Sequence, residues 1–260
     1  FISWESSKRK KHLPGCEDIM MNTPENWQDR TELLIGKENV LKLQNACVLI
    51  VGLGGVGGAA AEMIGRAGIG HLVIVDGDQV EATNLNRQLP ALTSTLGQYK
   101  TEIIGARLKA IHPDLDLELR TEYLLDSNIP ALLDSRHFDC VLDAIDTLTP
   151  KLQLAKAVLE RGIPLVSSMG AGARLNPEKI SCTDISKTYN CGLAKAFRHG
   201  LAQLGIRKGI QAVFSSELPL KEAIREEKGR NKRSATGTIS FMPAVFGCHC
   251  AAAVIRSLLR

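Results

Sequence analysis

Short apolar runs alternate with amphipathic segments through the first two thirds of the chain. The run "ACVLIV" at residues 46–51 is continuous and ends in glycines, which predicts a strand buried on both faces of a parallel sheet. The other strand-like runs are "LVIVD", "DLELRTE", "FDCVLDAID" and "LVSSMGA", and helical periodicity separates them at 57–67, 100–111, 126–135 and 150–161. This order predicts an α/β fold with a Rossmann-like, doubly wound, mostly parallel sheet.

The second half of the chain is less regular. "KISCTDI" and "QAVFSSE" are strand-like, and a helix is expected between them. The apolar face of that helix consists of Leu193, Phe197, Leu201 and Leu204. Residues 217–236 are charged and poorly periodic, which predicts a crossover segment. The pattern at 241–259 predicts an apolar helix that packs on the sheet or on a partner subunit.

The N-terminal segment differs from everything that follows it. It has no apolar period and carries the basic cluster "KRKK" at residues 8–11. Met20 and Met21 then precede a helical opening, "NTPENWQDRTELLIG". We therefore interpret residues 1–21 as a disordered or non-native extension, with the natural start at one of these two methionines.

Composition indicates a cytoplasmic globular protein. The chain has 260 residues, a formal net charge of +4 and seven cysteines, which are scattered and odd in number as reduced thiols would be. It contains no CxxC pair, so no zinc site is expected. We interpret Cys248 and Cys250 as small core residues rather than metal ligands, because i and i+2 on a helix point in different directions. The longest apolar stretch contains Pro243 and His249 and is shorter than the roughly 20 residues of a membrane span, so none is expected.

A glycine-rich segment follows the first predicted strand. Gly52, Gly54, Gly55 and Gly57 permit a tight turn and a close approach of backbone N–H groups to a phosphate at a helix N-terminus. Asp76 ends the second strand, where an acid can bind ribose hydroxyls. Alone, this pattern is also typical of NAD- and FAD-dependent oxidoreductases.

Further polar residues favour a triphosphate with Mg²⁺ over a nicotinamide. Asp76 and Asp78 lead into a polar loop, Lys100 begins a helix, and Asp143 and Asp146 stand at the end of a central strand. The residues of the polar loop are Asn84, Asn86 and Arg87.

The side chains of Arg87 and Lys100 can neutralise the negative charge that develops when the α-phosphate of ATP is attacked. The Asp146 carboxylate can hold Mg²⁺ through oxygen. Each residue also has a purely structural explanation: Arg87 as a helix cap, Lys100 as a solvated first-turn charge, and Asp143 as a group that orders its own loop.

The segments "GLGGVG", "VDGDQVEATNLNRQ", "GQYK" and "DAIDT", in this order and spacing, resemble the superfamily of ThiF, MoeB and the ubiquitin-activating enzymes. The resemblance implies ATP binding and attack of a carboxylate on the α-phosphate, giving an acyl-adenylate and pyrophosphate. It implies that the family's ATP-site positions are occupied here by Gly54, Asp76, Asn86, Arg87, Lys100 and Asp146. It also implies a homodimer in which an N-terminal arginine, here Arg30, reaches the partner's ATP.

Within that superfamily, the second half is similar to the tRNA threonylcarbamoyladenosine dehydratases. The segments that carry this likeness are "SSMGAGARLNPEKISCTDISKT", "GLAKAFRHGL" and "GTISFMPAVFG". MoeB and ThiF relatives usually carry paired CxxC zinc ligands and a crossover cysteine, whereas residues 217–240 contain no cysteine. Cys191-Gly192 departs from the Asp-Pro that relatives often have there. The resemblance implies ATP-dependent cyclisation of the modified adenosine with release of AMP, and it leaves a cysteine-desulfurase-type sulfur-relay partner open.

The resemblance divides the chain into an ATP-binding adenylation core, 22–185, and a part that carries tRNA binding, the crossover and dimer contacts, 186–260. Charge agrees with this division, because residues 187–233 hold eleven basic against four acidic side chains, a net of +7 that leaves −3 elsewhere. Such a surface suits a polyanion, although basic runs also occur as solvated faces. The candidate tRNA contacts are Arg198, Lys228, Arg230, Lys232 and Arg233.

Three other functions remain possible from the sequence. The first is adenylation of the C-terminus of a ubiquitin-like sulfur-carrier protein, which would use the same ATP site. The second is an NAD-dependent oxidoreductase, and the third is a relative that binds tRNA or a partner without turning ATP over.

Overall fold

The computed structural model describes residues 26–226 and 234–260. The expected N-terminal extension, 1–21, therefore lies outside the described residues. So do four of the five candidate tRNA contacts, Lys228, Arg230, Lys232 and Arg233.

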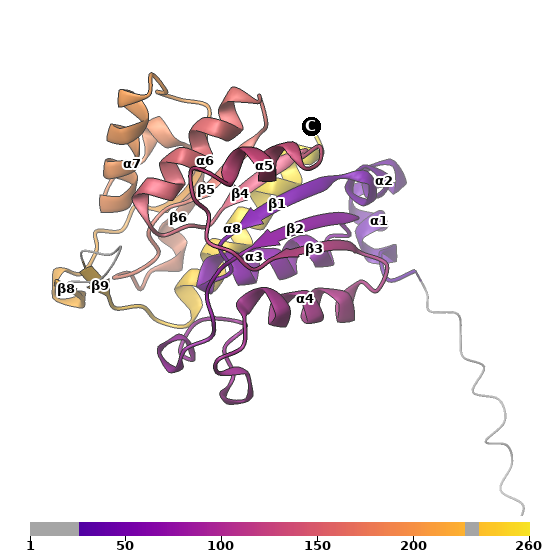
Figure 1. The fold of residues 1–260 in the computed structure, drawn as a ribbon, viewed down its shortest axis with the longest axis horizontal. Helices are drawn as coiled ribbons and strands as arrows, with labels where there is room; N and C mark the ends of the chain where they lie inside the picture. Colours follow the sequence, from indigo (N-terminus) through magenta and orange to yellow (C-terminus); the bar gives the residue numbers. More distant parts are fainter. Residues whose placement is uncertain (1–25, 227–233) are drawn as a thin grey trace, which may run out of the picture.

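One seven-stranded sheet forms the centre of the fold, with strand order β3-β2-β1-β4-β5-β7-β6 (Figure 1). Every neighbouring pair is parallel except β6 with β7, which is antiparallel. The strands are β1 (Cys47–Val51), β2 (His71–Val75), β3 (Asp116–Arg120), β4 (Cys140–Asp143), β5 (Leu165–Ser168), β6 (Ile180–Asp184) and β7 (Gln211–Ser215). The predicted Rossmann-like, mostly parallel α/β class is confirmed.

Helices cover both faces of this sheet, so the sheet separates two hydrophobic cores. One core lies under α3 (Gly55–Arg66), α4 (Lys100–Ile111) and α8 (Phe241–Leu258). The other lies under α5 (Ile129–Asp134), α6 (Leu148–Glu160) and α7 (Gly192–Gln203). Successive β1 residues alternate between them, since Ile50 belongs to the first core and Leu49 to the second. This two-sided burial explains the continuous apolar run.

The strand and helix order expected from periodicity is observed, with differences at the ends of elements. The run "FDCVLDAID" is strand only over Cys140–Asp143, because the chain turns directly after Asp143. The helical opening is divided into α1 (Asp29–Ile35) and α2 (Lys37–Asn45) at Gly36, whose φ of 83° cannot continue a helix. The described parts of the crossover include a short antiparallel pair, β8 (Ile224–Glu226) with β9 (Ser234–Thr236).

The C-terminal helix α8 packs along α3 and across the first face of the sheet. By length and composition it is the one helix among the described residues that could cross a membrane, and 44% of it is buried inside the protein. Its contacts are those of a core helix, so the expectation that 241–259 packs on the sheet is confirmed. The interpretation of both cysteines on it as core residues is wrong for one of them: Cys250 is buried, whereas Cys248 faces outward.

The turn from β1 into α3 depends on glycine at two positions. Gly52 has a φ of 91°, and a Cβ there would lie 2.9 Å from the carbonyl oxygen of Ala144. A Cβ on Gly57 would lie 1.7 Å from the carbonyl oxygen of Gly52. The helix can therefore start this close to the strand only if position 57 has no side chain.

We expect Gly57→Ala to lower the free energy of unfolding by about 3 kcal/mol or more, at the upper end of overpacking costs, because backbone atoms must move to admit the methyl group. Urea denaturation measures this change. The control is Gly192→Ala in the first turn of α7, where a Cβ would meet no atom within 4 Å. It should be neutral or slightly stabilising, by roughly 0.5 kcal/mol. Equal stability of the two variants would contradict the account of the turn.

Candidate functional site

Three neighbouring strands bring the predicted site residues to one edge of the sheet. β2, β1 and β4 are adjacent and parallel, so their carboxyl ends meet at the same edge. Asp76 follows β2, Gly52 follows β1, and the segment 144–146 follows β4. This is the edge at which α/β proteins bind their ligands.

Backbone contacts join these three strand ends. The Gly52 N–H donates to the Val75 carbonyl at 2.8 Å, and the Ala144 N–H donates to the Val51 carbonyl at 2.8 Å. Gly52 and Gly57 both lie against Ala144. The glycine turn and the loop after β4 are therefore one packed unit.

The N-terminus of α3 is bordered by the loop that contains Arg87. Gly54 is the N-cap and Gly55 the first helical residue, so the N–H groups of the first turn have no partner within the helix. A Cβ on Gly55 would lie 3.3 Å from the carbonyl oxygen of Arg87, and one on Gly54 would lie 3.8 Å from the Gln88 side chain. Twelve residues of α3 stand behind these N–H groups, and the helix dipole favours an anion there.

Asp76 fixes the turn through both carboxylate oxygens. Oδ2 accepts from the Leu53 N–H at 2.6 Å, and Oδ1 accepts from the Asp78 N–H at 2.7 Å. Burial raises the pKa of this carboxyl, against the Lys100 charge and the two N–H donors, which lower it. The remaining lone pairs can accept from hydroxyl groups of a ligand.

Lys100 is held at the site by Asp78. It is the first residue of α4, its side chain is 5% exposed, and its Nζ lies 2.8 Å from Asp78 Oδ2. The other oxygen of Asp78 accepts from the Tyr123 hydroxyl at 2.9 Å, and this bond raises the pKa of Tyr123. The explanation of Lys100 as a solvated charge is therefore wrong. Sequence reasoning missed Tyr123, whose only signal was its place just after β3.

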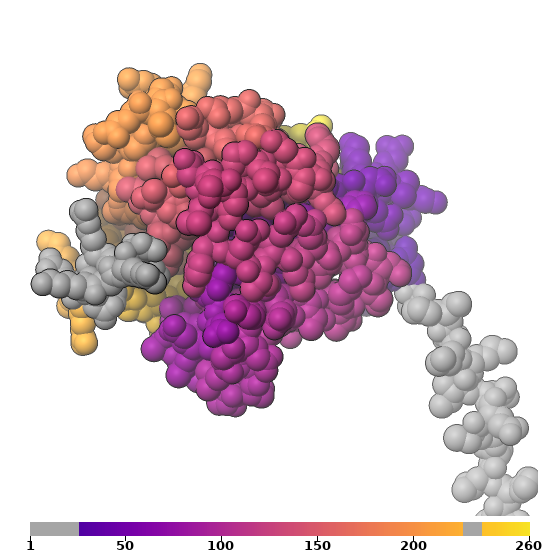
Figure 2. Space-filling model, in the orientation of Figure 1, coloured from indigo at the N-terminus to yellow at the C-terminus, as the bar shows by residue number. Residues whose placement is uncertain are grey.

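The polar loop between β2 and α4 stands out at the lower edge of the molecule in Figure 2. Asn84 is buried, and its Oδ1 accepts from the Glu81 N–H at 3.2 Å. Arg87 Nη1 donates to the Thr83 carbonyl and to Asn86 Oδ1, both at 2.8 Å. Asn86 in turn donates to the Thr238 carbonyl at 3.0 Å, which ties this loop to the segment before α8.

The two acids after β4 have different environments. Asp143 is fully buried and forms an ion pair with Lys151 at 2.7 Å, so its structural explanation applies. Asp146 is exposed at the strand edge. Lys151 was not predicted, although its place among Leu148, Ala155 and Val158 on the apolar face of a helix was a visible signal.

The two remaining described candidates lie elsewhere. Arg30 is exposed on α1, which precedes β1 and so stands at the amino end of the strands, away from the glycine turn. Arg198 is on α7, at the side of the sheet formed by β6 and β7 (Figure 1). Within 26–226 and 234–260, no group of three His, Cys, Asp or Glu side chains could hold a metal ion by itself.

Comparison with known proteins gives consistent relatives. The ThiF family model matches residues 29–260. The chain is 39% identical to the tRNA threonylcarbamoyladenosine dehydratase of Bacillus subtilis (strain 168) over 239 residues, covering 89% of this chain and 94% of that protein. It superimposes on the crystal structure of the Escherichia coli tRNA N6-threonylcarbamoyladenosine dehydratase in complex with ATP with a TM-score of 0.80, at 30% identity over 88% of this chain and 92% of that one. The AMP complex of the same protein gives the same values.

Proposed function

The chain belongs to the ThiF family, as its motifs predicted, and from that premise we propose that it dehydrates threonylcarbamoyladenosine in tRNA with ATP as co-substrate. It is an adenylating enzyme of the ligase class. The observation that carries the proposal is the likeness, over nearly the whole chain, to a dehydratase solved with ATP and with AMP. The reaction belongs in the cytoplasm, where tRNA and ATP occur together.

The chemistry needs two bond changes at one carboxyl group. The threonyl carboxylate attacks the α-phosphate of ATP, which gives an acyl-adenylate and pyrophosphate. A nitrogen or oxygen of the same carbamoyl group then attacks the acyl carbon, AMP leaves, and a proton is lost. Net loss of water results, and since ring closure is intramolecular, it needs no enzyme nucleophile. This agrees with the lack of cysteine in residues 217–240.

We propose the following roles for the predicted residues at the strand edge. The N–H groups at Gly54, Gly55 and Gly57 donate to phosphate oxygens, and Asp76 accepts from the ribose hydroxyls. Lys100 exchanges Asp78 for phosphate, and Arg87, from the loop above the turn, neutralises the charge that develops on attack. Asn84 and Asn86 hold that loop in place. Asp146 is the ligand for Mg²⁺, a cation that prefers carboxylate oxygens and usually takes few of them from the protein.

Loss of either cation should reduce turnover much more than tRNA affinity. We expect Lys100→Ala and Arg87→Ala to lower the rate of dehydration by roughly 100-fold or more, while the Kd for tRNA changes by less than about threefold. The assay is mass spectrometry of nucleosides after incubation of threonylcarbamoyladenosine-containing tRNA with ATP and Mg²⁺.

The control is Lys156→Ala, which removes an exposed lysine of α6 and should retain full activity. Unchanged turnover in Lys100→Ala would remove that residue from the site. Wild-type protein that leaves the tRNA unchanged, but exchanges pyrophosphate in the presence of a ubiquitin-like carrier protein, would favour the sulfur-carrier alternative.

A homodimer accounts for two features of α1. Leu33 and Leu34 are 89% and 84% exposed, which is unusual for adjacent apolar side chains on a helix. Arg30 lies one turn earlier on the same helix, and α1 stands at the opposite end of the strands from its own chain's glycine turn. A second copy that covers Leu33 and Leu34 would allow Arg30 to reach the partner's ATP.

Mixing of inactive subunits tests the role of Arg30. Arg30→Ala and Lys100→Ala homodimers should each have low activity. If Arg30 acts across the interface, one site in each mixed dimer contains both side chains, and an equal mixture should regain about a quarter of wild-type activity. No regain after subunit exchange, checked by native mass spectrometry, would place Arg30 outside the partner's site.

The tRNA-binding assignment keeps Arg198 and extends to its exposed neighbours. None of the cations around α7 has an ion-pair partner within the described part of the chain. They are Lys187, Lys195, Arg198, Arg207 and Lys208. We keep the division into 22–185 and 186–260 as part of this proposal, although β7 pairs with β5 in one continuous sheet.

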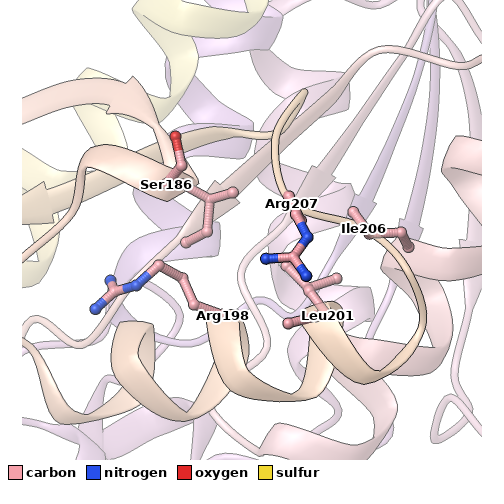
Figure 3. Close-up of a pocket in the computed structure, with 7 residues that line it drawn as sticks. Ser186, Arg198, Leu201, Ile206 and Arg207 are labelled. Atoms are coloured by element: carbon pink, nitrogen blue, oxygen red, sulfur yellow. The ribbon is translucent and has the colours of Figure 1, made fainter.

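Figure 3 shows how two of these cations lie. Arg207 borders a hollow of about 180 Å³ between α7 and the segment after β6, and its guanidinium extends across it. The guanidinium of Arg198 points away from Arg207 and donates to Thr188 Oγ1. The two groups do not converge on one ligand, so they suit separate phosphates of an extended backbone.

Charge removal on this surface should weaken tRNA binding in a salt-dependent way. We expect Arg207→Gln with Lys208→Gln to reduce the slope of log Kd against log salt by about 1 to 2, since each lost phosphate contact contributes about 0.9. Filter binding from low to physiological salt gives this slope. The matched control, Lys37→Gln with Lys42→Gln, removes two charges from α2 at the other side of the molecule. Equal slopes for the two pairs would contradict the assignment.

A further inference from the structure

The ion pair between Asp143 and Lys151 is sealed inside the protein. Its charged atoms lie 2.7 Å apart, and both side chains are 0% exposed. Lys151 Nζ also lies 5.5 Å from the centre of the Phe197 ring, and Asp143 Oδ2 accepts from Ser167 Oγ at 2.7 Å. Neither charge can touch a substrate, and neither has a part in the chemistry described above.

Such a pair adds little to stability. Removing two charges from water costs about as much as their attraction returns, and apolar side chains of similar volume are often as stable or more so. The pair therefore needs an explanation other than stability.

Both members of the pair hold the same residue. Asp143 Oδ1 accepts from the Ile145 N–H at 3.0 Å, and Lys151 Nζ donates to the Ile145 carbonyl at 3.0 Å. The preceding residue, Ala144, is bound to Val51 and packs against the glycine turn. Three hydrogen bonds therefore fix the backbone of residues 144 and 145. Asp146 is the next residue.

We propose that Asp143 and Lys151 are positioning residues that hold the segment 144–146 rigid, so that Asp146 is aimed at the glycine turn before ATP binds. The effect on rate rests on the proposed function, whereas the rigidity of the segment does not. A misplacement of about 1 Å at a reacting centre can reduce a rate by about 100-fold, which is the scale of effect at stake here.

The test uses the double variant Asp143→Asn with Lys151→Met. It removes both charges together and so avoids the unpaired buried charge that each single change would leave. The amide introduced at position 143 keeps an acceptor for the Ile145 N–H, but the Ile145 carbonyl loses its donor. The matched control is Lys156→Met, which changes an exposed lysine on the same helix.

We expect a thermal midpoint within a few degrees of wild type, and hydrogen exchange of the 144–147 amides at least about tenfold faster. The kcat should fall about 100-fold while the KM for ATP stays within about threefold, because the glycine turn and Asp76 are unchanged. A merely structural pair would not give this separation of kcat from KM.

Wild-type kcat in the folded double variant would overturn the proposal, and so would unchanged amide exchange or an equal rise in KM. If the double variant does not fold, hydrogen exchange of the 144–147 amides in the wild-type protein still tests the proposal. The Ile145 amide should then be protected as strongly as the β4 amides, and fast exchange there would overturn the proposal. If instead the wild-type enzyme failed to dehydrate tRNA while its 144–147 amides behaved as expected, only the proposed function would fail.

Discussion

The site depends on how closely two stretches of backbone approach each other where β1 turns into α3. The carbonyl oxygen of Gly52 occupies the position that a side chain at residue 57 would need. A second close approach occurs between α3 and α8, where a Cβ on Gly247 would lie 2.6 Å from the Val56 carbonyl oxygen. α8 can therefore lie directly on α3, and the C-terminal helix supports the N–H groups of the turn from behind.

Two ion pairs at the strand edge differ in their exposure to solvent. The pair of Lys100 with Asp78 is half open to solvent on the acid side, so a phosphate can replace the carboxylate without leaving a buried charge unpaired. The pair of Lys151 with Asp143 has no access to solvent, and its members bind the backbone of Ile145. An accessible charge pair suits a group that meets substrate, and a sealed pair suits one that sets geometry.

The surfaces proposed for a second subunit and for tRNA lie on other elements than the glycine turn. α1 carries exposed leucines at the amino end of the strands, and the α7 cations lie beside β6 and β7. In the proposed homodimer, the second subunit would bring its own Arg30 to the glycine turn, whereas the proposed polyanion surface lies on and around α7.

The sequence alone determined the α/β class, the place of the glycine turn and the acid after β2, because hydrophobic periodicity and glycine spacing are local properties of the chain. Motif order also gave the family. Only the tertiary structure decided that Cys248 faces outward while Cys250 is buried. It also decided which polar side chains meet, Lys151 with Asp143 and Tyr123 with Asp78. These pairings join residues on different elements, and they follow from the angle and depth at which helices pack on the sheet. No pattern along the chain encodes that angle, so the sequence left open whether Asp143 belongs to the site or orders its own loop, and the structure shows it as half of a buried ion pair.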